Sequence, residues 1–203
     1  MYFRARYGTI FYMNGEYIEK LAFEWITAPI SKIDTESERY CQTRDVFEAR
    51  NNRLPENLIQ KGLDESLAYI IYAMSGELGN NSFDHNLGNW PDVPGVFFAF
   101  DYNGKNGILV IADRGIGILN SLRKAIPDLT DEKKALEIAF TKKISSRVLE
   151  NRGNGLKFIK SNVLEKNLFL QLVSGETQVF LNHEMKISET TNPVKGCLVI
   201  LKF

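Results

Sequence analysis

The residues of this sequence that are best suited to chemistry lie between Met74 and His85, where Glu77 and Asn81 stand four positions apart. On an α-helix this spacing places both side chains on one face, a turn apart. A carboxylate beside an amide oxygen can hold a general base and a cation ligand next to each other. The same pair is also common on the polar face of a surface helix, so other segments must decide between the two interpretations.

A second segment, Asp113-Arg114-Gly115-Ile116-Gly117, follows a predicted strand. A lone Gly-x-Gly after a strand is found in Rossmann phosphate loops, but Asn120 fills the third glycine position and no parallel βαβ pattern follows. A carboxylate at a strand end needs hydrogen-bond donors, and the amino group of adenine is one such donor. Gly115 and Gly117 leave room for a flat ring against the backbone. A strand-end turn with a capping Asp is the alternative.

The third segment runs from Asn151 to Leu156 and contains Gly153 and Gly155 just ahead of a predicted helix. Glycines at this place expose backbone N–H groups and the positive end of the helix, which together form a natural anion site. Four basic residues just upstream could add charge to it: Lys142, Lys143, Arg147 and Arg152. A flexible loop followed by a plain helix start is the alternative.

The elements that position these segments follow from hydrophobic patterning. Apolar residues repeat at helical spacing from Leu63 to Leu78, which predicts a long helix from about Glu56 to Asn81 or beyond. Two apolar runs around Asn103-Gly104 predict an antiparallel hairpin of strands 96–102 and 107–113. The remaining predictions are helices at 119–125, 131–140 and 156–165, a second hairpin of strands 168–174 and 177–183 around Gly175-Glu176, and a last strand at 197–203.

Residues 1–56 carry no recognisable chemistry and are read as an N-terminal extension. Asn14-Gly15 lies between aromatic-rich runs and favours a β-hairpin, although the stretch from Tyr17 to Trp25 also suits a helix. Residues 27–56 are polar and predict a connector, with a short helix at 44–50. The aromatic content of the extension fits a satellite core under the sheet better than a homodimer or partner surface.

Composition excludes several classes of protein. The chain has 203 residues, of which 44% are hydrophobic, so it can bury a sizeable core. Basic and acidic residues both total 25, and this balance gives no field that would attract nucleic acid without a local patch. Two cysteines and two scattered histidines form neither a disulfide framework nor a zinc cluster. The sequence shows no signal peptide or membrane span, so a cytoplasmic location is the expectation.

The order of the three segments resembles the GHKL, or Bergerat-fold, ATPase family, whose ATP-binding domain is shared by DNA gyrase, the ninety-kilodalton heat-shock chaperone, histidine kinases and MutL. The matching motifs read ELGNNSFDH, ILVIADRGIGI and RGNGLKFI, and the resemblance covers about residues 57–203. It implies an α/β fold of the α+β, two-layer sandwich type, with a mixed, mostly antiparallel sheet and helices on one face.

The resemblance also implies ATP and Mg²⁺ as ligands and assigns roles to individual residues. Glu77 corresponds to the general base, and Asn81 to the Mg²⁺ ligand. Asp113 corresponds to the aspartate that reads adenine. Residues 141–152 correspond to a mobile lid. The glycines of the adenine pocket would be Gly115 and Gly117, and the phosphate loop would contain Gly153, Gly155 and Leu156.

Some positions depart from the family pattern and leave the branch open. Asp84 is similar to the gyrase and MutL branch, whereas His85 is similar to the histidine-kinase and anti-sigma branch. Many members carry a Thr near the adenine aspartate, where this chain has Gly196-Cys197. A water-mediated contact to adenine is therefore in question.

Three functions are compatible with these features. The leading one is slow, Mg²⁺-dependent ATP hydrolysis that drives a lid switch. The second is a protein kinase that phosphorylates a partner in trans, as anti-sigma serine kinases do. The third is an ATP-gated interaction module without turnover. All three imply a protein partner, whose identity the sequence does not give.

Overall fold

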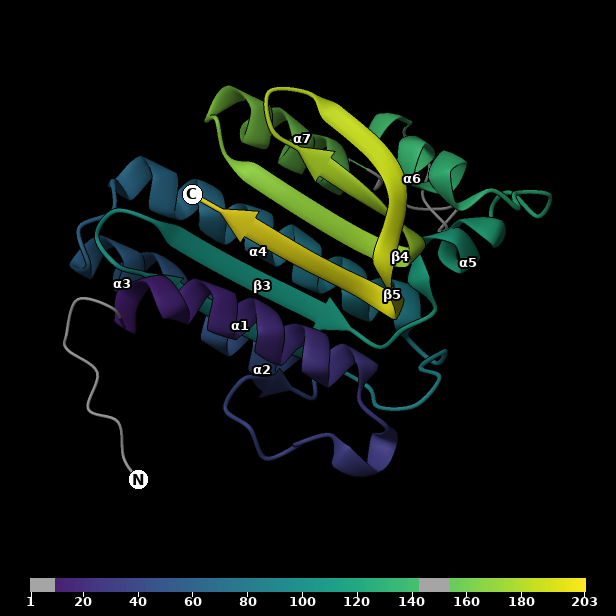
Figure 1. Cartoon of the computed structure of the whole chain (residues 1–203), viewed down its shortest axis with the longest axis horizontal. Helices are drawn as coiled ribbons and strands as arrows, with labels where there is room; N and C mark the ends of the chain where they lie inside the picture. Colours follow the sequence, from purple (N-terminus) through teal and green to yellow (C-terminus); the bar gives the residue numbers. More distant parts are fainter. Residues whose placement is uncertain (1–9, 143–153) are drawn as a thin grey trace.

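A five-stranded antiparallel sheet forms the centre of the structure, a computed structural model that describes residues 10–142 and 154–203. In sheet order β1-β2-β3-β5-β4, the strands are β1 (Tyr40–Cys41), β2 (Val96–Tyr102), β3 (Gly107–Asp113), β5 (Met185–Lys202) and β4 (Phe169–Leu181) (Figure 1). The helices are α1 (Ile10–Thr27), α2 (Arg44–Asn51), α3 (Leu54–Gln60), α4 (Glu65–Asn86), α5 (Gly117–Arg123), α6 (Glu132–Thr141) and α7 (Gly155–Glu165), with a short 3₁₀ helix, η1 (Ile30–Lys32).

Every strand pairing in the described residues is antiparallel, so the expectation of a mixed sheet is wrong there. The two strands β3 and β4 run in the same direction, and strands in this relation need a crossover connection. Here the connection passes through helices α5, α6 and α7. The two strands do not pair because β5 lies between them and is antiparallel to both. The fold is therefore α+β, with an antiparallel sheet at its centre.

Helices cover both faces of the sheet, not only one as expected. The larger core lies between the sheet and helices α2, α3, α4, α6 and α7, and its fully buried side chains include Phe47, Ile71, Leu109, Ile159 and Leu170. Helix α1 crosses the opposite face, in front of β3 in Figure 1. The predicted two-layer arrangement thus holds for helices α2–α7, and α1 adds a covering on the other side.

Residues 10–27 form one helix, so the hairpin expected around Asn14-Gly15 is wrong. The reason is the spacing of the apolar residues that follow. Ile18, Ala22 and Trp25 recur at helical intervals and are buried against β2, β3 and β5. This second core outweighs the local turn preference of the Asn-Gly pair, which lies inside the helix.

The predicted strands 96–102 and 107–113 are confirmed as β2 and β3. Helices α5, α6 and α7 confirm the helices expected in the C-terminal half. The long helix predicted from Glu56 is in fact two helices, because Asp64 caps a new helix by accepting a 2.9 Å hydrogen bond from the N–H of Leu67.

The second hairpin turns later than predicted. Strand β4 continues through Gly175-Glu176 with a shift in register, and the chain reverses at residues 182–184. The carboxylate of Glu132 accepts a 2.7 Å hydrogen bond from the N–H of Glu176 and so satisfies a donor that the irregular pairing leaves free. The turn signal in the sequence therefore marks a bulge, and the last strand begins at Met185 instead of Cys197.

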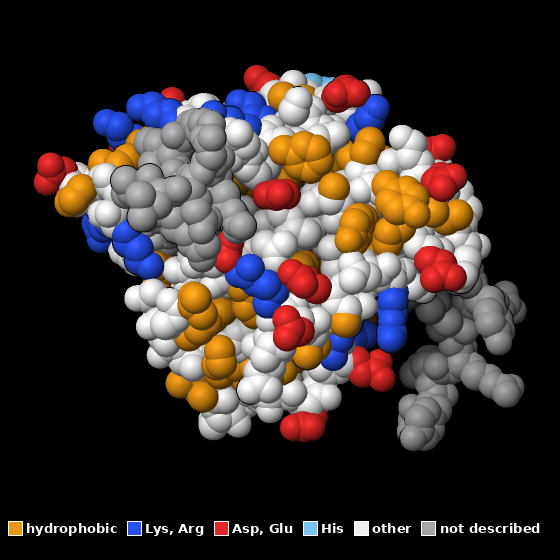
Figure 2. All heavy atoms as spheres, turned by 180° about the vertical axis from the view of Figure 1, so that it is seen from behind, with side chains coloured by type: hydrophobic (Ala, Val, Ile, Leu, Met, Phe, Trp, Pro, Cys, Tyr) orange, Lys and Arg blue, Asp and Glu red, His pale blue; other side chains and the backbone are white. Residues whose placement is uncertain are grey.

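Seen from behind, the surface mixes acidic, basic and hydrophobic side chains (Figure 2). Exposed aromatic residues include Tyr69 on α4 and Phe158 on α7, and scattered exposed aromatics are ordinary on a protein surface. No helix within the described ranges is both long and apolar enough to span a bilayer.

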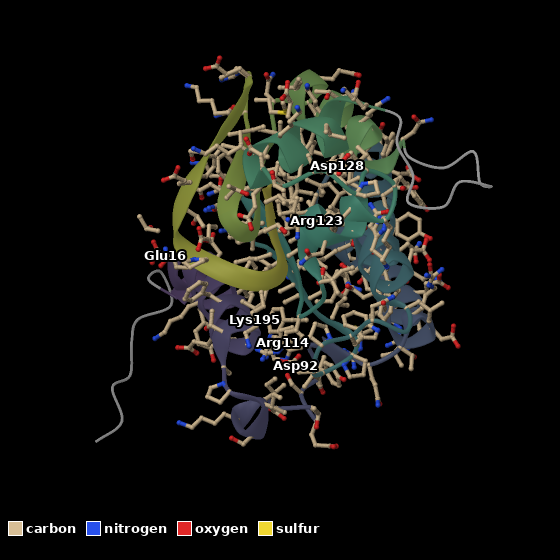
Figure 3. All side chains as sticks on the ribbon, turned by 90° about the vertical axis from the view of Figure 1, so that its right-hand side faces the viewer. Glu16, Asp92, Arg114, Arg123, Asp128 and Lys195 are labelled. Atoms are coloured by element: carbon tan, nitrogen blue, oxygen red, sulfur yellow. The ribbon has the colours of Figure 1, made fainter. Side chains whose placement is uncertain are left out.

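Arg114 joins α1 to the end of β3. Its guanidinium forms an ion pair with Asp92 at 2.6 Å, and both side chains are buried (Figure 3). It also donates hydrogen bonds to the carbonyl oxygens of Trp25 and Ile26 near the C-terminus of α1. These carbonyls lack partners within their own helix, so the cation satisfies them and interacts favourably with the helix dipole.

We expect Arg114→Met to lower the free energy of unfolding by about 3 kcal/mol, because it leaves the Asp92 carboxylate buried without its cation. The measurement is urea denaturation followed by circular dichroism. Lys61→Met is the matched control, since it breaks the more exposed ion pair with Asp101 and should cost under about 1 kcal/mol. Equal losses for the two variants would contradict a structural role for the buried pair.

Candidate functional site

Helix α4 presents a polar face to a cavity and an apolar face to the core. Ile71, Met74 and Leu78 are buried in the larger core. Glu77, Asn81 and Asp84 follow each other at intervals of four and three residues, and all line the cavity. The predicted convergence of Glu77 and Asn81 on one helix face is therefore confirmed. Glu77 is exposed and Asn81 is half-buried.

This central cavity has a volume of about 620 Å³, within the range of small-molecule sites. Asp113 from the end of β3 lines it together with Glu77 and Asn81. Further lining residues come from α2, α5, α6, α7 and β5 and include Arg44, Gly117, Ser121, Ala139, Gly155, Leu156 and Cys197. Segments far apart in the sequence thus meet around one space.

The carboxylate of Asp113 is buried and held by donors on several sides. Its Oδ2 accepts a 2.8 Å hydrogen bond from the Ser82 hydroxyl, and its Oδ1 accepts one of 2.9 Å from the N–H of Gly115. The Asn86 amide donates a longer bond of 3.4 Å to Oδ1. Burial raises the pKa of Asp113 to about 6, although these hydrogen bonds oppose the rise. At neutral pH the group is therefore mainly an ionised acceptor.

Gly115 and Asn86 form a close contact beside this carboxylate. A Cβ atom at Gly115 would overlap the Asn86 side chain, so the approach requires glycine. The Asn86 Oδ1 accepts a 2.8 Å hydrogen bond from the N–H of Ile116. One amide thus bridges α4 and the turn after β3. Gly117 follows at a φ of 76°, in the region that favours glycine, and lines the cavity.

The N-terminus of α7 approaches Glu77 closely. A Cβ atom at Gly155 would overlap the Glu77 carboxylate and lie 3.5 Å from the amide nitrogen of Asn81. Leu156, the next residue, lines the same cavity. The structure therefore brings Gly155 and Leu156 to the predicted base and cation ligand. Gly153 and most of the predicted lid lie outside the described residues.

The cavity includes polar groups that the sequence interpretation did not select. Ser82 and Asn86 line it and hold Asp113 in place. The Ser174 hydroxyl lies behind the lining and accepts a 3.0 Å hydrogen bond from the N–H of Ile118, which does line the cavity. Ser82 and Asn86 stand one turn apart on a helix face that is otherwise buried, and this spacing was the signal available in the sequence. Ser174 had no such signal, because its position depends on the β4 bulge.

His85 and Asp84 both line the cavity and both have partners. The Nδ1 of His85 lies 2.9 Å from the Ser121 hydroxyl, and Asp84 pairs with Arg44 from α2. His85 is thus a pocket residue whose ring is held by Ser121. Cys197 faces Asp113 across the β3–β5 ladder, and burial together with that carboxylate raises the pKa of its thiol well above the ordinary value.

The described residues contain no group of three His, Cys, Asp or Glu side chains that could hold a metal ion. A cation at this site would take few protein ligands, of which the Asn81 amide oxygen is the natural candidate. That donor set suits Mg²⁺, which binds through few protein oxygens when phosphate oxygens and water complete its octahedral shell. Zinc, which takes three or four nitrogen or sulfur ligands, does not fit.

In comparisons with known proteins, no family model and no curated protein matches this chain.

We expect Asp113→Asn to stabilise the fold at neutral pH. Because the folded pKa of about 6 exceeds the ordinary 3.8, the folded state binds the proton more tightly than the unfolded chain. This tighter proton binding adds its full contribution to the free energy of unfolding only below about pH 4. The contribution is lost as the pH rises through 6. The amide avoids the cost of a buried charge, which is about 3 kcal/mol for a shift of this size.

The measurement is urea denaturation of both proteins near pH 4 and near pH 7.5. The stability difference should be largest at the higher pH and shrink toward the lower one. A variant that is less stable at both pH values would mean that the hydrogen bonds of the carboxylate outweigh its desolvation.

Proposed function

We propose that this chain is a Mg²⁺-dependent ATP-binding domain of the GHKL type that hydrolyses ATP slowly. The proposal rests on one observation: Asp113, Asn81 and Glu77 line the same cavity. The N-terminus of α7 lies beside Glu77 and Asn81. The α+β fold with helices against an antiparallel sheet supports the proposal as well.

The adenine end would lie at Asp113. A buried carboxylate that is ionised at neutral pH accepts a hydrogen bond from the amino group of adenine. Guanine presents a carbonyl oxygen at that place, and an acceptor facing a buried carboxylate is strongly disfavoured. Gly117 lines the cavity next to this carboxylate, whereas the space beside Gly115 is filled by the Asn86 side chain. The site therefore favours adenine nucleotides.

The phosphate end would lie between Asn81 and Gly155. Backbone N–H groups at a helix N-terminus bind phosphate, and α7 points this end at the cavity. Mg²⁺, when bound through Asn81, would neutralise phosphate charge and orient the terminal group. Glu77 is exposed at this end, so its carboxylate can accept a proton from an attacking water.

A kinase acting in trans is the second candidate, because the exposure of Glu77 is equally compatible with it. A carboxylate open to solvent can take the proton of a partner's hydroxyl group as readily as that of water. Radiolabelled ATP, incubated with the chain and candidate partners, separates the two functions. Label on a partner protein identifies a kinase, and label only in free phosphate identifies an ATPase.

Mg²⁺-ATP at a hundredfold excess over its dissociation constant should stabilise the protein by about 2.7 kcal/mol, seen as a rise in melting temperature. Mg²⁺-GTP at the same concentration should give a much smaller rise, because guanine lacks the donor that Asp113 requires. Asp113→Asn should lose most of the response to ATP. Equal shifts with both nucleotides would contradict adenine recognition by Asp113.

We expect Glu77→Gln to reduce phosphate release from Mg²⁺-ATP by about a hundredfold or more, since the amide cannot take a proton. Nucleotide affinity should change little, because the substitution keeps the size of the side chain. Glu48→Gln is the matched control, as Glu48 lines the same cavity from α2. If both variants release phosphate at the wild-type rate, Glu77 is not the base.

A further inference from the structure

A second hollow lies at the β2 edge of the sheet, away from Glu77, Asn81 and Asp113. Its volume is about 290 Å³, and we call it the β2 groove. Phe98, Ala99 and Phe100 of β2 line it, and Ile18 of α1 adds an apolar side chain. The polar lining is Arg39, Arg50, Arg53, Asn57 and Glu38. The groove shares no lining residue with the central cavity.

The edge of β2 is only partly paired. Strand β1 has two residues, and they pair with Val96 and Phe97. The N–H of Phe98 donates a 2.7 Å hydrogen bond to the carbonyl oxygen of Arg39. Because backbone groups alternate sides along a strand, the N–H of Phe100 faces the same edge, two residues further on. Past Phe98, the described residues provide no further strand on this side of β2.

The charge of the groove is predominantly positive, with three arginines against one glutamate. Arg50 is held in place, since its guanidinium donates to the carbonyl oxygen of Tyr40 at 2.8 Å and to the Cys41 sulfur at 3.3 Å. Arg39 and Arg53 are exposed, and neither forms an ion pair with a described carboxylate. Two guanidinium groups are thus available to an anionic partner.

We propose that the β2 groove binds an extended, acidic peptide segment of a partner protein, which adds to the sheet as a strand beside β2. The free edge supplies backbone hydrogen bonds, as in strand addition generally. Arg39 and Arg53 select carboxylate side chains, because guanidinium groups pair with them in a fork geometry. Phe100 and Ile18 offer apolar surface to the alternate side chains.

The chain's own N-terminal segment does not match this charge preference. Residues 1–9 include Arg4 and Arg6 and contain no Asp or Glu. A basic segment would place like charges together in the groove, which is unfavourable. An acidic partner is therefore the better complement.

The test uses the full chain and a fluorescein-labelled seven-residue peptide of alternating Glu and Val, followed by fluorescence anisotropy at low salt. We expect saturable binding that weakens by about tenfold or more in Arg39→Glu/Arg53→Glu, because attraction becomes repulsion. Arg50 is left unchanged, since its bonds to Tyr40 and Cys41 support the fold. Lys186→Glu, an exposed charge reversal on the β4–β5 hairpin, should bind like the wild type.

A second peptide separates strand addition from simple charge attraction. It has the same sequence with N-methyl groups on alternate residues, which remove the edge donors and keep the charge. It should bind about tenfold more weakly, since it cannot complete the ladder. Equal binding of both peptides, or unchanged binding in the double variant, would overturn the proposal.

A second copy of this chain is the other possible occupant of the groove, and sedimentation of the unliganded protein tests for it. A dimer that Arg39→Glu/Arg53→Glu dissociates would assign the groove to a second copy of this chain and would also overturn the proposal. Neither experiment contains a nucleotide, so the outcome is independent of ATP binding.

Discussion

The hydrogen bonds between α4 and the Asp113 carboxylate are the interaction on which the central cavity depends. Ser82 and Asn86 lie one turn apart on α4 and bind both oxygens of a group that is 2% exposed. A buried carboxylate without such partners would be too costly to keep ionised. The same bonds fix the rotation of α4, so Glu77 and Asn81 are turned toward the cavity.

The sequence was informative wherever a local pattern decided the structure. The strands of the β2–β3 hairpin were predicted correctly, because two apolar runs flank a strong turn signal. The shared helix face of Glu77 and Asn81 was also predicted correctly from helical spacing, whereas their meeting with Asp113 was implied only by the resemblance to the GHKL family. Helix periodicity also located α5, α6 and α7.

The predictions from the sequence were wrong where contacts between residues distant in the chain outweighed a local sequence signal. Asn14-Gly15 is a turn pair in isolation, but burial of Ile18, Ala22 and Trp25 against the sheet makes the segment helical. Gly175-Glu176 became a bulge because β4 continues to pair with β5 beyond it, with Glu132 bound to the backbone. Arg44 and Ser121 could not be assigned to the cavity from spacing, since α2 and α5 reach it only through tertiary packing.

Helix α2 borders both hollows of the molecule. Arg44 and Glu48 line the central cavity, and Arg50 lines the β2 groove. Between them, the Phe47 ring packs 6.2 Å from that of Phe83 on α4 and 5.2 Å from that of Phe98 on β2. A fully buried ring in tight packing transmits displacement instead of absorbing it. A shift of α2 is thus the route by which occupation of one hollow would be felt in the other, and thermodynamic reciprocity would make any change in affinity the same in both directions.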